Sequence, residues 1–367
     1  KLRKIIVKGY IYLFILCAVY SHAVPKNMNA LREMYLLPPS QWQKPHIDKG
    51  VEWQELAPLP ESPPYPDSNP YSKAKVELGK MLFDEPKLSF SNQIACASCH
   101  DREFGFGDGR RVSYGHNRQL GHRNAPSVVM SAFSTEQFWD GRAESLESQA
   151  LFPIADPKEM AYTPQYAAKK IAKIPAYKEK FKEAFGSVKI TPELMAQAIA
   201  TYERSLVPNP TRFDRFLKGK KDALTDKEVW GLHLFRTKGR CMNCYSGVAL
   251  SDGKYHNLGL HFIGRKYEDL GRYEVTGNPD DIGRFKTPSL RHISKTAPYM
   301  HNGLFPHLSG VLNAYNAGMF HPSPPKPGQE NTKAARELPF PGTDSLLQKL
   351  HLTNEELEAL EAFLKTL

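Results

Sequence analysis

The chain has 367 residues, of which 41% are hydrophobic and 24% are charged, and its formal net charge is +10. At roughly 150 residues per domain, this length predicts about two domains plus extensions and excludes one small module. The composition is that of a soluble globular protein, with 29 prolines that indicate much loop. A chain disordered throughout and a multi-span membrane protein are therefore both excluded.

The N-terminus has the features of a secretion signal. A basic start precedes an apolar stretch over residues 10–20, and a small-residue cleavage site ends at Ala23. We predict a signal peptide over residues 1–23 and export, with no stable membrane insertion after cleavage, because the apolar stretch is short for a bilayer span. An uncleaved anchor is the alternative. Without Lys1, Arg3, Lys4 and Lys8 the net charge is +6.

Residues 24–71 are rich in proline and carry little apolar periodicity, so we predict an extended arm. Helical signals dominate the rest of the chain. Thr191 precedes a proline at the first position of an apolar helical pattern, and two capping-box patterns begin at Thr225 and Thr353. Because no long alternating pattern indicates strands, we predict a mostly α fold with long loops.

A weak internal repeat divides this helical part. A Gly-x-x-Leu-Phe motif precedes each C-x-x-C pair, and a Pro-Ser motif follows each pair. The intervals from that proline to a glycine and then to a leucine are the same in both copies. The matching positions are Gly79 and Gly231 of the first motif, and then Pro126 and Pro288, Gly141 and Gly303, and Leu146 and Leu308. We therefore predict two copies of one unit, over residues 72–215 and 216–367.

Four cysteines follow the signal, as the pairs Cys96/Cys99 and Cys241/Cys244. In an exported protein such pairs are typical of two disulfides, of two halves of a zinc site, or of haem attachment. The first pair is followed by His100, which makes the C-x-x-C-H pattern of c-type haem: two thiols bind the two vinyl groups and the imidazole faces the iron. We predict haem at this pair, because zinc would need the second pair as well.

From about Glu77 to Leu367 the chain resembles the bacterial diheme cytochrome c peroxidase and MauG superfamily. The resemblance rests on the strings CASCHDREFGFGDG, GHRNAPS, FWDGRAESLESQALFPIADPKEM, YHNLGL, FKTPSLRH and TAPYMHNG. It implies two cytochrome-c-like haem domains, two haem c groups, a periplasmic location and a reaction with hydrogen peroxide.

By position, the resemblance assigns roles around the first haem. His100 corresponds to the proximal iron ligand and His116 to the distal histidine, for which a solvated loop histidine is the alternative. Gln149 and Glu159 correspond to the peroxide pocket, where a carboxylate moves a proton from the inner to the outer peroxide oxygen. Trp139 corresponds to the tryptophan between the haems, with interface packing as the alternative or additional role.

The resemblance also implies a calcium ion between the two domains. The corresponding residues are Asn124, Thr296 and Pro298. Calcium accepts backbone carbonyl oxygens, so such a site depends on loop geometry more than on side-chain identity.

The second site departs from the family pattern, because Tyr245 follows Cys244 where the family has histidine. Three interpretations are open: Tyr245 ligates the iron as a phenolate, another residue or water does, or the second haem is lost. Tyr315 stands where the peroxidases have a methionine ligand, which is a MauG-like feature; helix packing is its alternative role. Several histidines are further candidate ligands: His256, His261, His292, His301 and His307.

The sequence thus predicts a periplasmic diheme peroxidase of MauG-like type that oxidises a protein partner or its side chains with hydrogen peroxide. One alternative is a cytochrome c peroxidase fed by a small cytochrome. Another is a non-enzymatic c-type electron carrier, which would not need Glu159. The basic charge suits an acidic partner surface. Nucleic acid is not expected as a partner, because no basic-aromatic binding motif is present.

Overall fold

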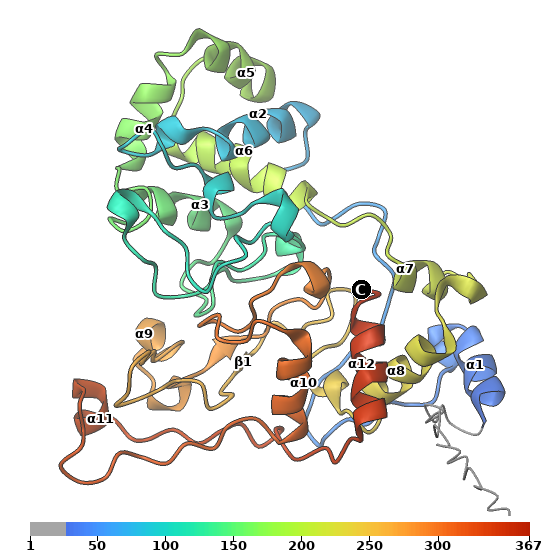
Figure 1. The fold of residues 1–367 in the computed structure, drawn as a ribbon. Coiled ribbons are helices and arrows are strands. Elements are labelled where there is room, and N and C mark those ends of the chain that lie inside the picture. The colour runs from blue at the N-terminus through green and yellow to red at the C-terminus, as the bar shows by residue number, and fades with distance from the viewer. Residues whose placement is uncertain (1–26) are drawn as a thin grey trace, which may run out of the picture.

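The computed structural model describes residues 27–367, which form two groups of helices connected by long loops (Figure 1). The predicted signal peptide and Cys17 lie outside the described residues. Among the described residues, no helix has the length and apolar character needed to cross a membrane.

The first group of helices carries the first C-x-x-C pair and lies in the upper part of Figure 1. A buried apolar core lies between its helices and includes Leu82, Phe83 and Ile199. The helices are α2 (Lys73–Phe83), α3 (Leu146–Ala155), α4 (Pro164–Ile171), α5 (Pro175–Phe185) and α6 (Pro192–Ser205).

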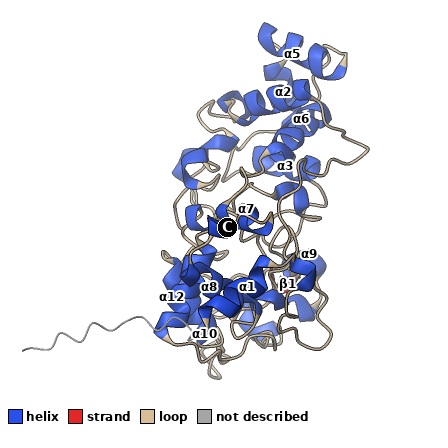
Figure 2. Ribbon diagram, turned by 90° about the vertical axis from the view of Figure 1, so that its right-hand side faces the viewer, coloured by secondary structure: helices blue, strands red, loops and turns tan. Residues whose placement is uncertain are grey.

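The second group has its own buried core, which includes Phe213, Phe235 and Phe363. Its helices are α7 (Arg212–Leu217), α8 (Asp226–Arg236), α9 (Tyr273–Thr276), α10 (Leu308–Asn316), α11 (Lys333–Glu337) and α12 (Asn354–Leu364). Its two-residue strands β1 (Tyr255–His256) and β2 (Phe285–Lys286) pair antiparallel. Helices and loops otherwise account for the ribbon (Figure 2), so the predicted mostly α fold is confirmed.

The helix starts follow the capping signals of the sequence. Thr191 accepts a hydrogen bond from the backbone N–H of Leu194, the third residue of α6. Thr225 and Thr353 each form a complete capping box, with Glu228 and Glu356 respectively. These side chains bind N–H groups that lack a partner within the helix, which fixes the first turns of α6, α8 and α12.

The internal repeat corresponds to one helix crossing formed twice. Gly79 of α2 faces α6 so closely that a Cβ there would lie 1.9 Å from the carbonyl oxygen of Ala198. Gly231 of α8 faces α12 in the same way, with 2.0 Å to the carbonyl oxygen of Ala359. The glycine of the Gly-x-x-Leu-Phe motif thus permits close backbone contact between two helices in each unit.

Adding a methyl group at either crossing is expected to destabilise its unit. Gly79→Ala and Gly231→Ala should each lower the free energy of unfolding by about 1–3 kcal/mol, the usual cost of overpacking. Denaturant titration followed by circular dichroism measures this loss. Gly342→Ala is the matched control, because nothing lies within 4 Å of a Cβ there and its φ is not positive. Equal stability of Gly231→Ala and Gly342→Ala would contradict the role of the crossing.

The segment predicted as an extended arm is only partly extended. Residues 44–71 contain no regular helix or strand, but α1 (Met28–Leu36) precedes them. Tyr35 and Trp42 are buried in the core of the second group, and Tyr35 Oη lies 3.1 Å from His233 Nδ1 of α8. Helix α1 was not predicted, because proline-rich composition dominates the segment, whereas contact with α8 stabilises the helix.

Candidate functional site

The first C-x-x-C pair begins a short helical turn that directs three side chains into one cavity. The turn spans Cys96–Ser98, and the backbone N–H of His100 donates to the carbonyl oxygen of Cys96 at 3.0 Å. Cys96, Cys99 and His100 all line a cavity of about 830 Å³. All four described cysteines are free, so the structure does not favour the two-disulfide alternative.

His100 has the hydrogen bonding and charge state of a metal ligand. Its Nδ1 lies 3.1 Å from the carbonyl oxygen of Phe106, so Nδ1–H donates there and the lone pair of Nε2 remains available. Burial lowers the pKa of His100, which favours the neutral imidazole that binds metals. The cavity, the two thiols and this imidazole together fit a covalently attached haem.

Glu159 and Gln149 line the same cavity, as the resemblance implies. Gln149 is on α3, and Glu159 follows that helix in a turn in which its backbone N–H donates to the carbonyl oxygen of Asp156. Burial, with a smaller contribution from the negative charge of Asp156, raises the pKa of Glu159 to about 6. A carboxyl group with this pKa exchanges protons near neutral pH, which suits acid–base catalysis.

His116 does not belong to the lining of this cavity. Its ring contacts the exposed ring of Phe90, with centroids 5.6 Å apart, and its backbone N–H donates to the carbonyl oxygen of Glu159. Nδ1 is buried without a hydrogen-bond partner. The structure thus places His116 beside the Glu159 segment and outside the cavity lining, and its ligation remains a prediction.

Trp139 joins the two units. It lines the first cavity, and its indole N–H donates to the carbonyl oxygen of Asn124 at 2.9 Å. Its own carbonyl oxygen accepts from the backbone N–H of Lys286, on β2 of the second unit, and its ring lies 6.4 Å from that of His301. The position suits both packing at the interface and a link between the two sites.

An ion-pair network next to Trp139 holds the units together, and no sequence motif indicated it. Arg123 donates to both carboxylate oxygens of Asp269 at 2.7 Å and also pairs with Asp140 and Glu274. Asp140 is almost fully buried. Because Arg123 and Asp140 belong to the first unit and the other two to the second, the network fixes the relative position of the two sites.

The residues proposed for calcium are not brought together as a visible cluster of side-chain oxygens. Asn124 lines the first cavity and donates through Nδ2 to the carbonyl oxygen of Arg110 at 2.8 Å. The Thr296 hydroxyl donates to the carbonyl oxygen of Ile293 at 3.3 Å. Thr296 and Pro298 are not cavity residues. The calcium site therefore remains a prediction.

The second C-x-x-C pair adopts the same local turn as the first. The turn spans Cys241–Asn243, and the backbone N–H of Tyr245 donates to the carbonyl oxygen of Cys241 at 2.9 Å. Tyr245 therefore occupies the position that His100 has in the first unit. The two thiols thus repeat the spacing and local turn of the first pair.

Tyr245 and Tyr315 meet in this second site, although 70 residues separate them in the sequence. Tyr315 comes from α10, and the two hydroxyl oxygens lie 2.9 Å apart in a hydrogen bond. Burial, and then the neighbouring phenol, raise the pKa of Tyr245 well above its ordinary value. A metal ion held by either phenol oxygen would have to compete with this hydrogen bond.

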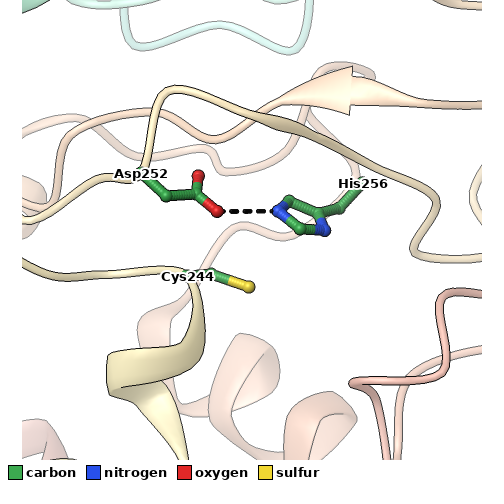
Figure 3. A group of neighbouring side chains, drawn as sticks. All are labelled: Cys244, Asp252 and His256. Carbon is green, nitrogen blue, oxygen red and sulfur yellow. Dashed lines mark hydrogen bonds and ion pairs between the residues drawn. The ribbon is translucent and has the colours of Figure 1, made fainter. Parts of the chain in front are cut away.

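A cluster of Cys244, Asp252 and His256 lies beside this turn, and it is the one group among the described residues with ligand atoms near enough to share a metal ion (Figure 3). His256 Nε2 lies 2.9 Å from Asp252, and its Nδ1 lies 2.6 Å from Asp344. These carboxylates raise the pKa of His256 to about 12 against the effect of burial, which keeps both ring nitrogens protonated. A metal would therefore have to break two ion pairs, so the cluster holds a structural imidazolium.

The other candidate histidines, all within residues 27–367, show no contact by which one of them would replace the missing family ligand. His301 lines the first cavity and stacks on Phe285, with centroids 3.5 Å apart. His261 packs against Phe340. The His292 backbone N–H donates to Leu367 O, and His307 precedes the first residue of α10. A zinc site that combines both cysteine pairs is likewise not formed in the described part of the chain.

The class of protein follows from two helical units, each with a C-x-x-C turn, and from one cavity lined by a neutral histidine and buried carboxyl groups: a c-type cytochrome with a reactive site. The family model described as di-haem cytochrome c peroxidase matches residues 73–222. This chain belongs to the di-haem cytochrome c peroxidase and MauG family, and it is an oxidoreductase that acts on hydrogen peroxide.

Named relatives support both branches of the family. Cytochrome c551 peroxidase of Nitrosomonas europaea is 43% identical over 235 residues, which are 64% of this chain and 70% of that protein. The methylamine utilization protein MauG of Methylorubrum extorquens is 35% identical over 325 residues, which are 86% of this chain and 85% of that one. Among solved structures, a MauG-like protein associated with microbial copper homeostasis superposes with a TM-score of 0.73 at 33% identity and covers 84% of this chain and 94% of its own.

Proposed function

We propose that this protein is a MauG-like peroxidase, which uses hydrogen peroxide to oxidise a partner protein or side chains of that partner. The observation that carries the proposal is Tyr315, whose hydroxyl lies at the second C-x-x-C turn, 2.9 Å from that of Tyr245. The identity of the axial ligand shifts haem potentials over roughly 0.8 V, and an anionic oxygen favours the ferric state more than a methionine sulfur does. A site of this kind is a poor store for an electron from a donor cytochrome.

We assign attachment of the first haem to Cys96 and Cys99, with His100 as the proximal ligand. The second haem would be held by Cys241 and Cys244, with one of the two phenols as its ligand. When bound, haem supplies the redox chemistry that protein side chains lack.

The chain's own residues supply proton transfer and alignment in this proposal. Glu159 accepts the proton of the bound peroxide and returns it to the departing oxygen, and the Gln149 amide holds the peroxide by a hydrogen bond. Trp139 provides a short aromatic link between the sites, supported by its contacts with both units. A calcium ion at Asn124, Thr296 and Pro298 would stabilise this interface.

The periplasm is the proposed location, with a redox partner or substrate protein that presents an acidic surface. The support is the N-terminal signal pattern and the basic net charge. Covalent haem attachment through C-x-x-C is consistent with export. No contact with nucleic acid is proposed.

The second candidate is a cytochrome c peroxidase that reduces hydrogen peroxide with electrons from a small cytochrome. It is favoured by the 43% identity to the Nitrosomonas enzyme. The third alternative, an electron carrier, is opposed by Glu159, since a carrier needs no ionisable carboxyl group in its haem cavity.

Replacement of Tyr315 by methionine separates the two enzyme candidates. If Tyr315 is the phenol that binds the iron, Tyr315→Met should raise the potential of the second haem, because a neutral thioether favours ferric iron less than a phenolate, and should increase turnover with a reduced small cytochrome as donor. Spectroelectrochemical titration measures the first effect and donor oxidation kinetics the second. Tyr315→Phe, which only removes the oxygen, is the control. Identical titration curves for wild type and Tyr315→Met would show that Tyr315 only packs beside the site.

A further inference from the structure

Glu203 is a buried carboxyl group in the first cavity that neither the sequence motifs nor the proposed reaction uses. It lies on α6, near the end of that helix, and only 4% of its surface is exposed. It lines the same cavity as Cys96, His100 and Glu159, and its Oε2 is buried without a hydrogen-bond partner. A buried polar atom without a partner is costly, so its presence in a cavity wall calls for a role.

The neighbouring charges do not stabilise the ionised form of Glu203. Arg204 is the adjacent cation, but both of its terminal nitrogens bind Glu147 of α3, at 2.5 and 2.9 Å. Burial therefore outweighs Arg204 and, helped by the charge of Glu147, raises the pKa of Glu203 to about 8. The other titratable groups that interact with it are Tyr202 on α6 and Cys96, and a Cys96 bound to haem as a thioether no longer titrates.

We propose that ionised Glu203 takes up one proton when an electron is delivered to the first haem site, so that the charge of this cavity stays constant. The inference rests on the haem-binding role of the first cavity in the proposed function. One electron enters, one proton from solvent binds the free Glu203 carboxylate, and no other bond forms or breaks. Reoxidation releases the proton.

The physical reason is the burial of Glu203 itself, which leaves its carboxyl group with little contact with solvent. A charge added to a poorly solvated space interacts strongly with another charge within a few ångströms. An additional negative charge at the haem position opposes ionisation of Glu203 and raises its affinity for a proton. Glu203 is better placed for this role than Glu147, whose charge is already balanced by Arg204.

The midpoint potential of the first haem tests this coupling in the holoprotein without any substrate. In the wild type the potential should fall as pH rises through the region around pH 8, by up to about 59 mV per pH unit, the equivalent of a tenfold concentration change for a one-electron couple. Glu203→Gln keeps the shape of the side chain and removes the ionisation, so its potential should be constant over that region. The visible haem spectrum confirms that the variant is loaded.

Two further variants make the result specific. Glu159→Gln should keep the fall around pH 8, because it removes a different carboxyl group of the same cavity. Glu147→Gln frees Arg204 to stabilise ionised Glu203, so the fall should move to lower pH. Unchanged pH dependence in Glu203→Gln, or no dependence in the wild type, would overturn the proposal.

A measurement on the wild type alone tests the proposal even if the Glu203→Gln variant does not fold. Redox-induced infrared difference spectra should show a protonated-carboxyl band that gains intensity on reduction near pH 8 and shifts when glutamate is labelled with ¹³C. Absence of a shifting carboxyl band would also overturn the coupling. None of these readouts depends on oxidation of a partner protein, so failure of the proposed function at the second site would leave this result intact.

Discussion

Replacing Glu159 by glutamine is expected to slow the reaction with hydrogen peroxide by at least about tenfold, and by up to about 10⁴-fold, the range of general acid–base catalysis. The carboxylate lies in the wall of the first cavity, whereas the amide has the same shape and cannot accept the proton. Stopped-flow mixing of the haem-loaded enzyme with hydrogen peroxide measures the rate. An unchanged rate with an intact haem spectrum would reject Glu159 as the proton carrier.

The pH dependence of the same reaction identifies the group directly. Burial raises the pKa of Glu159 to about 6, and the proton acceptor is the ionised form, so the wild-type rate should rise with pH through about 6. At pH 5 the rate should be about tenfold below its plateau, because about one-tenth of the carboxyl groups are ionised one unit below the pKa. Glu159→Gln should lack this rise.

Asp156→Asn provides the matched control for this assignment. The negative charge of Asp156 contributes to the raised pKa of Glu159, so its neutralisation should move the rise to lower pH without lowering the plateau. Asparagine can still accept the hydrogen bond that Asp156 Oδ1 receives from the backbone N–H of Lys158 at 2.7 Å. A rise at the same pH in this variant would indicate that another group titrates.

Tyr245 is expected to determine the spectrum of the second haem. If Tyr245 rather than Tyr315 is the phenol that binds the iron, Tyr245→Phe, which retains the ring and removes the oxygen that lies 2.9 Å from Tyr315, should abolish a phenolate-to-iron charge-transfer band in the ferric protein. Tyr245→His should give a second haem of higher potential, since neutral imidazole favours ferric iron less than phenolate. Optical and paramagnetic resonance spectra of the ferric protein report both changes.

The ratio of haem to protein shows whether the second haem is present at all. The raised pKa of Tyr245 means that the protein holds a neutral phenol at this position until a cation displaces its proton. About one haem in the wild type and about two in Tyr245→His would show that tyrosine does not support the second haem. That outcome would contradict any electron path through the second site.

The sequence by itself determined the fold class, and it predicted the repeat and the points of haem attachment. Helix caps, apolar periodicity and the C-x-x-C spacing act between residues near in the chain, so Thr225, Gly231 and Cys96 are informative without knowledge of distant contacts. The sequence also shows that no histidine follows Cys244, but it does not show which residue would bind the iron of the second haem. The missed helix α1 is the exception, because its stability depends on contact with α8, far along the chain.

Only the tertiary structure decided how distant side chains share a site. It placed the Tyr315 hydroxyl against Tyr245, held His256 between two carboxylates and turned His116 toward Phe90. It also exposed Glu203 to the first cavity, while the adjacent Arg204 is engaged by Glu147. Charge states, hydrogen-bond partners and ligand geometry depend on burial and on atoms brought together from several helices, and local sequence contains neither.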